Sequence, residues 1–511
     1  MKTIVLIVSC LFSVAGASQN SLVWEQTFGG GMYDFARQVE FTSDGGLISI
    51  GHTQSSDGDV SLNQGGGDVW LIKTTSNGAI EWEQTFGGSA FDYGSSVVQT
   101  SDGGFVAAGY SESTDGNVTG NHGNGDIWII KVSNTGSLIW EKTFGGSLRE
   151  TAQSIQQTSD GGFIVCGYSE SVNGDITSGS ESGEVWIIKL NNSGLLMWEH
   201  SYGGSAYESG QDIKLCSDGG FLFTGITHSN DGDVSGLNGT GNCWVVKTDS
   251  MGAIKWEHTY GGSNFDFGQS LENTNDGGFI LAGYSESTDG DVHGNHGAGD
   301  GWMVKCDVNG NIQWEKTLGS SGNDQVYSVV ELPGSGYALT GFSGYGDGDV
   351  SMNKGSLDCW MVILNSDGSI KTQQSFGGSG LDLGYCIRRA SDGTLVIAGY
   401  SESADGDIAG NNGGGDSWIL GLDVNTVSVK EESITSALKV WPNPGNGNYT
   451  FSGIEDGGLL RISDVRGQFI FSKTLDENEY NLDISNHSAG LYFYQLIRKN
   501  GAVSEGKLIL N

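Results

Sequence analysis

The stretch Trp82-Glu83-Gln84-Thr85-Phe86-Gly87-Gly88-Ser89 decides the fold, because close copies of it return at one fixed interval of 58 residues. The copies begin at Trp24, Trp82, Trp140, Trp198, Trp256 and Trp314, and a seventh keeps the register from Thr372 through Phe376-Gly377-Gly378. Repetition at a constant period without insertions is typical of one supersecondary unit stacked on itself, since a single unit cannot bury enough surface alone. The sequence therefore predicts a repeat protein.

Each repeat carries the signals of four short strands. In the second copy the expected strands are Ser95–Thr100, Phe105–Tyr110, Asp126–Lys131 and Leu138–Trp140. Ser101-Asp102-Gly103-Gly104 is a turn signal between the first two, and Asn134-Thr135-Gly136 is one between the last two. Four antiparallel strands per repeat are typical of a propeller blade. We therefore expect an all-β protein, a seven-bladed β-propeller with a small C-terminal β-sandwich.

The two ends of the array favour a closed ring. Leu22-Val23-Trp24-Glu25 reads as an outermost strand without a blade, whereas the seventh copy reaches only its third strand, at Trp418. An N-terminal strand that completes the last blade would remove the open edge of a linear stack. The tryptophans recur at two positions of the repeat, on the third and the fourth strand, and we expect both sets to pack in the core between blades. The third-strand set is Trp70, Trp128, Trp186, Trp244, Trp302, Trp360 and Trp418.

Length, composition and the chain ends indicate a secreted protein. Met1-Lys2, the apolar run that follows and Ala15-Gly16-Ala17 read as a signal peptide, and no later segment approaches the length of a membrane helix. We divide the chain into a signal peptide (1–17), a propeller (18–425), a linker (426–437) and a second domain (438–511). The net charge of −37 excludes nucleic acid as a partner, since phosphate binding needs a basic surface. We expect a monomer.

The second domain carries a set of motifs in a fixed order. They are Pro442-Asn443-Pro444, Asp464 with Gly467, Gly490 before an aromatic strand, and Lys507 in the last strand. This set at the C-terminus resembles the C-terminal sorting domain of the type IX secretion system. The resemblance implies the type IX machinery as a partner, and a protein that is secreted or attached to the outer cell surface. The alternative is a generic immunoglobulin-like binding module.

The propeller has looser resemblances. Phe86-Gly87-Gly88-Ser89 and Gly109-Tyr110-Ser111-Glu112-Ser113 resemble a bacterial β-propeller repeat family of cell-surface proteins, which implies a fold and a compartment but no reaction. Asn134-Thr135-Gly136 with Trp140 is similar to the tryptophan-docking turn of quinoproteins. Those enzymes usually have eight blades and adjacent cysteines, so we interpret this likeness as shared packing.

Carboxylates recur just before the first strand of every repeat. This acidic ring is Asp34, Asp92, Glu150, Glu208, Asp266, Asp324 and Asp382. The loop between the second and third strands carries further acids and opens on the same face of a propeller. The sequence therefore predicts that one face gathers most of the negative charge.

Within that loop the oxygen-bearing side chains alternate in a pattern that suits Ca²⁺, which takes hard oxygen ligands closed by a carboxylate. The candidate ligands in four copies are Asp57, Asp59, Asn63 and Asp68; Asp289, Asp291, Asn295 and Asp300; Asp347, Asp349, Asn353 and Asp358; and Asp405, Asp407, Asn411 and Asp416. The alternative is that Asp and Asn cap tight loops by accepting local backbone N–H groups. Calcium is the one cofactor that the pattern suggests.

Three classes of function fit these observations. The first is a non-catalytic binding or adhesion protein that presents its acidic loop face to a glycan or protein ligand. The second is a secreted glycoside hydrolase or lyase, since paired carboxylates can do acid–base work. Against it, an arginine cluster for an acidic sugar is not visible, because the propeller has only Arg37, Arg149, Arg388 and Arg389. The third is a structural surface-layer component.

Overall fold

The computed structural model describes residues 21–334, 336–423, 439–452, 454, 457–464, 469–498 and 503–511. The expected signal peptide, the linker and Gly467 of the sorting motif lie outside these residues. The chain divides into two compact units, Met1–Val427 and Ser428–Asn511. Every described element is a strand.

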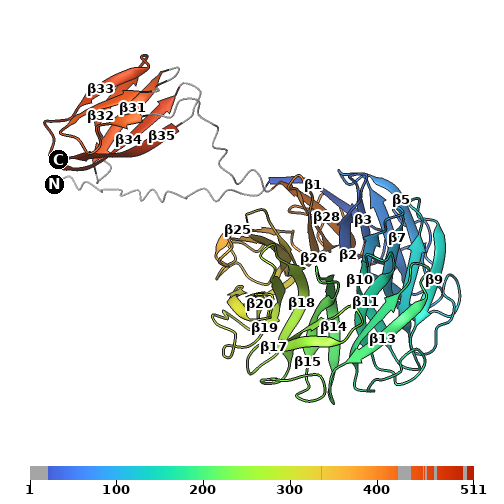
Figure 1. The fold of residues 1–511 in the computed structure, drawn as a ribbon. Coiled ribbons are helices and arrows are strands. Elements are labelled where there is room, and N and C mark those ends of the chain that lie inside the picture. The colour runs from blue at the N-terminus through green and yellow to red at the C-terminus, as the bar shows by residue number, and fades with distance from the viewer. Residues whose placement is uncertain are drawn as a thin grey trace, which may run out of the picture. The chain divides into compact units, whose positions relative to one another are not determined.

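The first unit consists of seven four-stranded antiparallel sheets arranged as the blades of a ring (Figure 1). Blades one to three are β2 (Asp34–Phe41), β3 (Leu47–Thr53), β4 (Asp68–Thr74) and β5 (Ile80–Phe86); β6 (Asp92–Gln99), β7 (Phe105–Ser111), β8 (Asp126–Val132) and β9 (Leu138–Phe144); and β10 (Glu150–Gln157), β11 (Phe163–Ser169), β12 (Glu184–Leu190) and β13 (Leu196–Tyr202). Blades four to six are β14 (Glu208–Leu215), β15 (Phe221–Thr227), β16 (Asn242–Thr248) and β17 (Ile254–Tyr260); β18 (Asp266–Asn273), β19 (Phe279–Ser285), β20 (Asp300–Cys306) and β21 (Ile312–Leu318); and β22 (Gln325–Glu331), β23 (Tyr337–Ser343), β24 (Asp358–Leu364) and β25 (Ile370–Phe376). The propeller prediction is confirmed.

The seventh blade joins the two ends of the array. Its strand order is β1 (Ser21–Phe28), β28 (Asp416–Asp423), β27 (Leu395–Ser401) and β26 (Asp382–Arg389). β1 runs antiparallel to β28, with Glu25 opposite Leu420. The expected closure by strand exchange is therefore present.

The dipeptide Trp-Glu has a distinct contact for each of its residues. The seven third-strand tryptophans are at most 2% exposed, as expected for core residues. In each blade the indole Nε1 of this buried tryptophan donates to the fourth-strand side chain that follows the repeated Trp, for example Trp128 to Glu141 at 3.0 Å. In the seventh copy Gln373 replaces Glu and still accepts from Trp360 at 2.9 Å.

The fourth-strand tryptophans differ from the prediction, because they are only partly buried and do not lie inside the core. Trp82 packs against the edge of the cluster between its blade and the next. Its indole Nε1 donates to the carbonyl of Asn134 in the neighbouring blade at 3.1 Å, and Trp314 makes the equivalent bond to Ser366 at 3.0 Å. This is a docking contact between blades at the outer edge of the ring, and a polar ring nitrogen needs that partner.

The C-terminal unit has two sheets around one core. One contains β29 (Lys439–Trp441), β30 (Asn448–Ser452) and β33 (Glu479–Asp483), and the other contains β32 (Phe469–Leu475), β31 (Gly458–Asp464), β34 (Gly490–Arg498) and β35 (Val503–Leu510). Two motif segments meet here, because the Asn443 side chain donates to the carbonyl of Lys507 at 2.6 Å and accepts from the Ile509 N–H at 2.9 Å. The sorting motif therefore ties the first loop of this unit to its last strand.

Candidate functional site

The connections between blades are held by the side chains that the sequence singled out. At one connection four successive N–H groups, those of Gly87, Gly88, Ser89 and Ala90, each have a side-chain acceptor. The acceptors are Asn117, Asp92, Asp115 and Ser113, at 2.7–3.2 Å. The equivalent four bonds recur at Gly261–Asn264. The repeated Gly-Gly segments thus supply the N–H donors, and the repeated polar side chains supply the acceptors that hold each connection.

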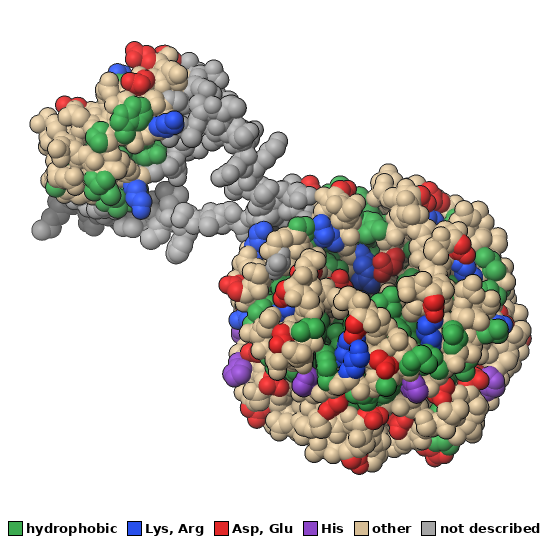
Figure 2. All heavy atoms as spheres, viewed as in Figure 1, with side chains coloured by type: hydrophobic (Ala, Val, Ile, Leu, Met, Phe, Trp, Pro, Cys, Tyr) green, Lys and Arg blue, Asp and Glu red, His purple; other side chains and the backbone are tan. Residues whose placement is uncertain are grey.

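The acidic ring is buried, which corrects the prediction that it belongs to an exposed acidic face. All seven carboxylates are 0% exposed. Asp92 accepts from the Gly88 N–H at 2.8 Å, from Ser113 Oγ at 2.8 Å and from Ser111 Oγ. A buried carboxylate requires such donors, because it has lost its water. On the viewed face of the propeller, acidic side chains are scattered among other residue types rather than gathered in one patch (Figure 2).

A second set of buried carboxylates faces the ring across five blade junctions. These junction pairs are Asp68 with Asp92, Asp126 with Glu150, Asp300 with Asp324, Asp358 with Asp382, and Asp416 with Asp34. A methyl group on Gly87 would lie 2.4 Å from Asp68 Oδ1 and 2.6 Å from Asp92 Oδ2, so the two oxygens flank this glycine. At the other two junctions Glu184 and Asn242 occupy the position of Asp68.

The third-strand member of each junction pair has an unsatisfied oxygen. Its Oδ1 is buried without a hydrogen-bond partner in Asp68, Asp126, Asp300, Asp358 and Asp416. Burial raises the pKa of Asp68, Asp358 and Asp416 to about 6 in each case. Protonation gives this acid an O–H donor and removes one of the two negative charges of the pair.

The sixteen candidate calcium ligands all contact backbone N–H groups. Asp57 accepts from Gly31 at 2.7 Å, Asp59 from Gly29 at 3.2 Å, Asn63 from Gly65 at 2.9 Å and Asp68 from Gln64 at 2.8 Å. The other three copies repeat the arrangement. In the described part of the chain no group of three or more His, Cys, Asp or Glu side chains could hold a metal ion. These contacts favour the loop-capping alternative.

The first strand of every blade carries a β-bulge at the same place. The pairing with the second strand skips one residue, for example Ser95 between Gly94 and Ser96. The skipped bulge residues are Arg37, Ser95, Gln153, Gln211, Gln269, Tyr327 and Tyr385. A bulge re-aims a side chain, so two consecutive residues of each first strand face the same side. That side is the central channel.

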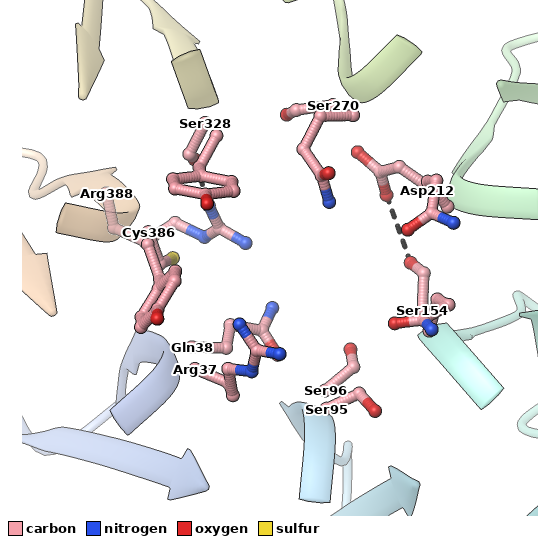
Figure 3. Close-up of a pocket in the computed structure, with 15 residues that line it drawn as sticks. Arg37, Gln38, Ser95, Ser96, Ser154, Asp212, Ser270, Ser328, Cys386 and Arg388 are labelled. Atoms are coloured by element: carbon pink, nitrogen blue, oxygen red, sulfur yellow. Dashed lines mark hydrogen bonds between the residues drawn. The ribbon is translucent and has the colours of Figure 1, made fainter. Parts of the chain in front are cut away.

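The residues that follow the bulges connect one blade to the next inside the channel. These bridging residues are Gln38, Ser96, Ser154, Asp212, Ser270, Ser328 and Cys386. Asp212 accepts from Ser154 Oγ at 3.0 Å (Figure 3) and from the Leu271 N–H at 2.9 Å, and Gln38 Oε1 accepts from the Val97 N–H at 2.6 Å. Six of the seven bridging side chains, all but Ser270, are hydrogen-bonded to a neighbouring blade in this way.

Several bulge residues have unused polar groups, whereas Ser95 Oγ donates to the Ala152 carbonyl and Gln211 Nε2 donates to Ser209 Oγ. Together with the bridging residues and Arg388, the bulge residues line a channel cavity of about 320 Å³. Figure 3 shows the Arg37 side chain extending from its strand into this cavity. Within the described residues the side chains of Arg37, Gln153 and Gln269 have no hydrogen-bond partner. A cavity of this size with free donors is suited to a small polar ligand.

A second cavity of about 430 Å³ lies further along the first strands and is lined by charged pairs. Arg388 Nε binds Glu40 at 2.6 Å, and Lys214 Nζ lies 3.3 Å from Asp212 and 3.7 Å from Glu272. Burial raises the pKa of Glu272, an effect that the Lys214 ammonium opposes. Glu40 and Glu272 at this end are therefore engaged by cations, whereas Glu331 accepts from the Asn275 N–H at 3.0 Å.

Sequence reasoning missed the channel residues, although a signal for them exists. At the bulge position seven copies of one repeat carry Arg, Ser, Gln, Gln, Gln, Tyr and Tyr, whereas the junction positions nearby hardly change. The sequence also gives no sign that Arg37 lines the same channel as Arg388 and Arg389, which lie about 350 residues further along the chain. A position whose residue type changes from repeat to repeat, while its neighbours stay the same, is the sequence signal for these channel residues.

Comparison with known proteins identifies the C-terminal unit. Residues 439–511 match the family described as "Secretion system C-terminal sorting domain". The protein is therefore a β-propeller that carries a type IX sorting domain, and it is secreted or attached to the outer cell surface. Among the described residues no helix has the length and apolar character needed to span a bilayer.

Solved structures give only distant similarity to the whole chain. PorZ of Porphyromonas gingivalis, described as an essential bacterial surface component of the type IX secretion system, is 11% identical with a TM-score of 0.38, over 94% of this chain and 59% of PorZ. The Neurospora crassa Pan2 WD40 domain is 10% identical with a TM-score of 0.43, over 76% of this chain and 89% of that domain. The chain thus spans well under two thirds of PorZ. No curated protein sequence is significantly similar to the chain.

Proposed function

We propose that this protein is a non-catalytic binding protein of the cell exterior, which holds a polar ligand in the central channel of its propeller. The supporting observation is the contrast between bulge and bridging residues. Both sets line the channel and both vary from blade to blade, but bridging residues such as Gln38 and Asp212 are hydrogen-bonded to a neighbouring blade, whereas the bulge residues Gln153 and Gln269 offer free amide donors. A ligand without seven-fold symmetry requires such an uneven wall.

The proposal moves the ligand site from the acidic loops to the channel. The loop carboxylates cap backbone N–H groups, which gives them a structural role, and the acidic ring is buried and closed to a ligand. The site residues are then the seven bulge residues, with Arg388 at the inner limit of the cavity.

The contacts of the channel carboxylates support binding over catalysis. A glycoside hydrolase requires one carboxyl group that protonates the leaving oxygen and a second that acts as nucleophile or base. Asp212 accepts from Ser154 Oγ and the Leu271 N–H and lies beside Lys214, while Glu40 is bound by Arg388. Groups held in this way are poor acids and poor nucleophiles.

A binding screen with a plugged channel tests the proposal. The mature chain and its Gln269→Trp variant would be applied to arrays of oligosaccharides and peptides, because an indole on this bulge fills the cavity. Ile139→Trp is the matched control, since Ile139 is 55% exposed on β9. We expect a ligand that binds the wild type and the control and not the plugged variant. Ligands that bind all three equally would contradict the proposal, and ordered self-assembly without ligand binding would favour a structural surface-layer role.

A further inference from the structure

The arginines of the propeller have an uneven distribution. Residues 18–425 contain only four, and three of them, Arg37, Arg388 and Arg389, line the channel cavities. They come from β2 and β26, the first strands of the first and last blades, which the closed ring brings side by side. Arginine is rare in this propeller, and the net charge of the protein is −37, yet three of the four arginines lie where a channel ligand would lie.

These cations differ in whether they already have a partner. Arg388 is bound by Glu40 at 2.6 Å. Arg37 has no carboxylate within 4.0 Å among the described residues, and its Cζ lies 4.6 Å from the centre of the Tyr385 ring. Stacking on an aromatic face holds a guanidinium in one orientation and leaves its N–H groups free. Arg37 is therefore an oriented and unpaired cation inside the channel.

Among the described residues that line this cavity, Asp212 is the only acid, and it does not compete for Arg37. Asp212 Oδ1 accepts from Ser154 Oγ and the Ile213 N–H, and its Oδ2 accepts from the Leu271 N–H. Two arginines line the cavity against this one aspartate. The cavity therefore favours an anion, and a planar guanidinium is suited to the two oxygens of a carboxylate.

The remaining wall indicates what carries the carboxylate. The bulge residues that face Arg37 are amides and hydroxyls, with Tyr327 and Tyr385 presenting rings whose centres are 5.1 Å apart. A pyranose ring with several hydroxyl groups matches such a wall, since it can bond to amides on its edges and pack one face against an aromatic ring. A peptide would bring apolar side chains that this lining does not accommodate.

We propose that the channel binds a carboxylated sugar, with the sugar carboxylate paired to Arg37. This inference rests on the proposed function and names its ligand class. The carboxylate lies between the guanidinium and the free amides of Gln153 and Gln269, and the sugar ring lies against Tyr327 or Tyr385. Arg37 determines specificity for the acid over the neutral sugar.

Glucuronic acid and glucose, which differ only in the C6 carboxylate, are the probes. Calorimetric titration of the mature full chain at low ionic strength should show about 10–100-fold tighter binding of glucuronate, the range for a charge-assisted bidentate contact. Arg37→Gln should abolish this preference for glucuronate over glucose. Arg149→Gln is the matched control, because Arg149 stacks on Tyr110 at 4.8 Å and does not line the cavity.

Three results would overturn the inference. They are equal affinity for the two sugars, an undiminished preference in Arg37→Gln, and binding of neither sugar. The oligosaccharide and peptide arrays with the Gln269→Trp variant test whether the channel binds any ligand. That test does not depend on the charge of the ligand, so the proposed function and this inference can fail independently. If Arg37→Gln does not fold, Arg37→Lys keeps the charge without the planar fork, and we then expect a preference reduced several-fold and more sensitive to salt.

Discussion

The blade junctions and the channel wall are built from the same seven repeats, but the junction residues are nearly the same in every repeat and the bulge residues of the channel wall are not. At the junctions a buried Trp, a Glu that accepts its Nε1–H and a buried ring carboxylate recur in nearly every copy. On the channel wall the bulge residues keep their backbone geometry and change their chemistry. Positions that repeat hold the ring together, and positions that vary within a fixed geometry are free to bind.

The largest expected effect lies at a junction tryptophan. Trp128→Ala removes a side chain that is 2% exposed, and Glu141 loses the indole donor while keeping its bonds from Thr119. We expect a loss of about 3–5 kcal/mol in the free energy of unfolding, the usual range for an emptied aromatic site. Urea denaturation followed by tryptophan fluorescence measures it, with the exposed Ile139→Ala as the control. A loss below about 1 kcal/mol would mean that the repeated tryptophans do not carry the junctions.

The junction pairs predict a stability that depends on pH. The pKa of Asp68 is about 6 in the folded protein against 3.8 for the free residue, so the fold favours the protonated acid. Its contribution is fully present below about pH 4 and is lost as pH rises through 6. Asp68→Asn mimics the protonated acid, as Asn242 does at its own junction, and should stabilise the propeller at pH 8 by on the order of 2 kcal/mol.

Melting curves from pH 4 to 8 compare this variant with Asp102→Asn. Asp102 is bound by Lys131 at 2.8 Å, which with the Thr100 hydroxyl lowers its pKa to about 2. Its contribution has the opposite sign, being present above about pH 4 and lost below it. A destabilised Asp68→Asn at pH 8 would show that the junction aspartate is needed in its ionised form.

The channel wall should tolerate change with little effect on stability. Gln269→Ala removes an amide without a protein partner, and we expect a change within about 0.5 kcal/mol in the free energy of unfolding. The same denaturation experiment measures it. The neighbouring bridging residue gives the contrast, since Asp212→Ala removes three hydrogen bonds and should cost more. Equal losses would remove the distinction between bulge and bridging residues.

The smallest expected effect is the response to calcium. Because the loop aspartates spend oxygen atoms on backbone N–H groups, we expect CaCl₂ and NaCl at equal ionic strength to raise the melting temperature equally. A rise specific to calcium that Asp347→Ala with Asp349→Ala reduces would instead establish the loops as calcium sites.

The sequence predicted the ring well, because its information is local and repeated. Strand limits, closure by β1 and the buried third-strand tryptophans follow from turn signals and from a period that is never interrupted. The burial of the ring carboxylates did not follow, since a carboxylate at a loop is ordinarily solvated and only the neighbouring blade supplies its donors. The channel was hidden for a similar reason. Arg37 and Arg388 meet only when the ring closes, and a bulge of one residue leaves no trace in the alternation of a short strand.

The closing strand also sets the order in which this protein is completed. β1 is the first strand of the chain to be synthesised, yet its partner β28 is the last strand of the propeller. The Trp418 Nε1 bond to Glu25 Oε2 spans 393 residues at 3.2 Å. An unpaired strand edge therefore remains at each end of the nascent propeller until all seven repeats have been synthesised. Closing a loop of this length is slow. Any chain that stops before β28 keeps both edges open, so the propeller can close only after the chain has reached residue 423.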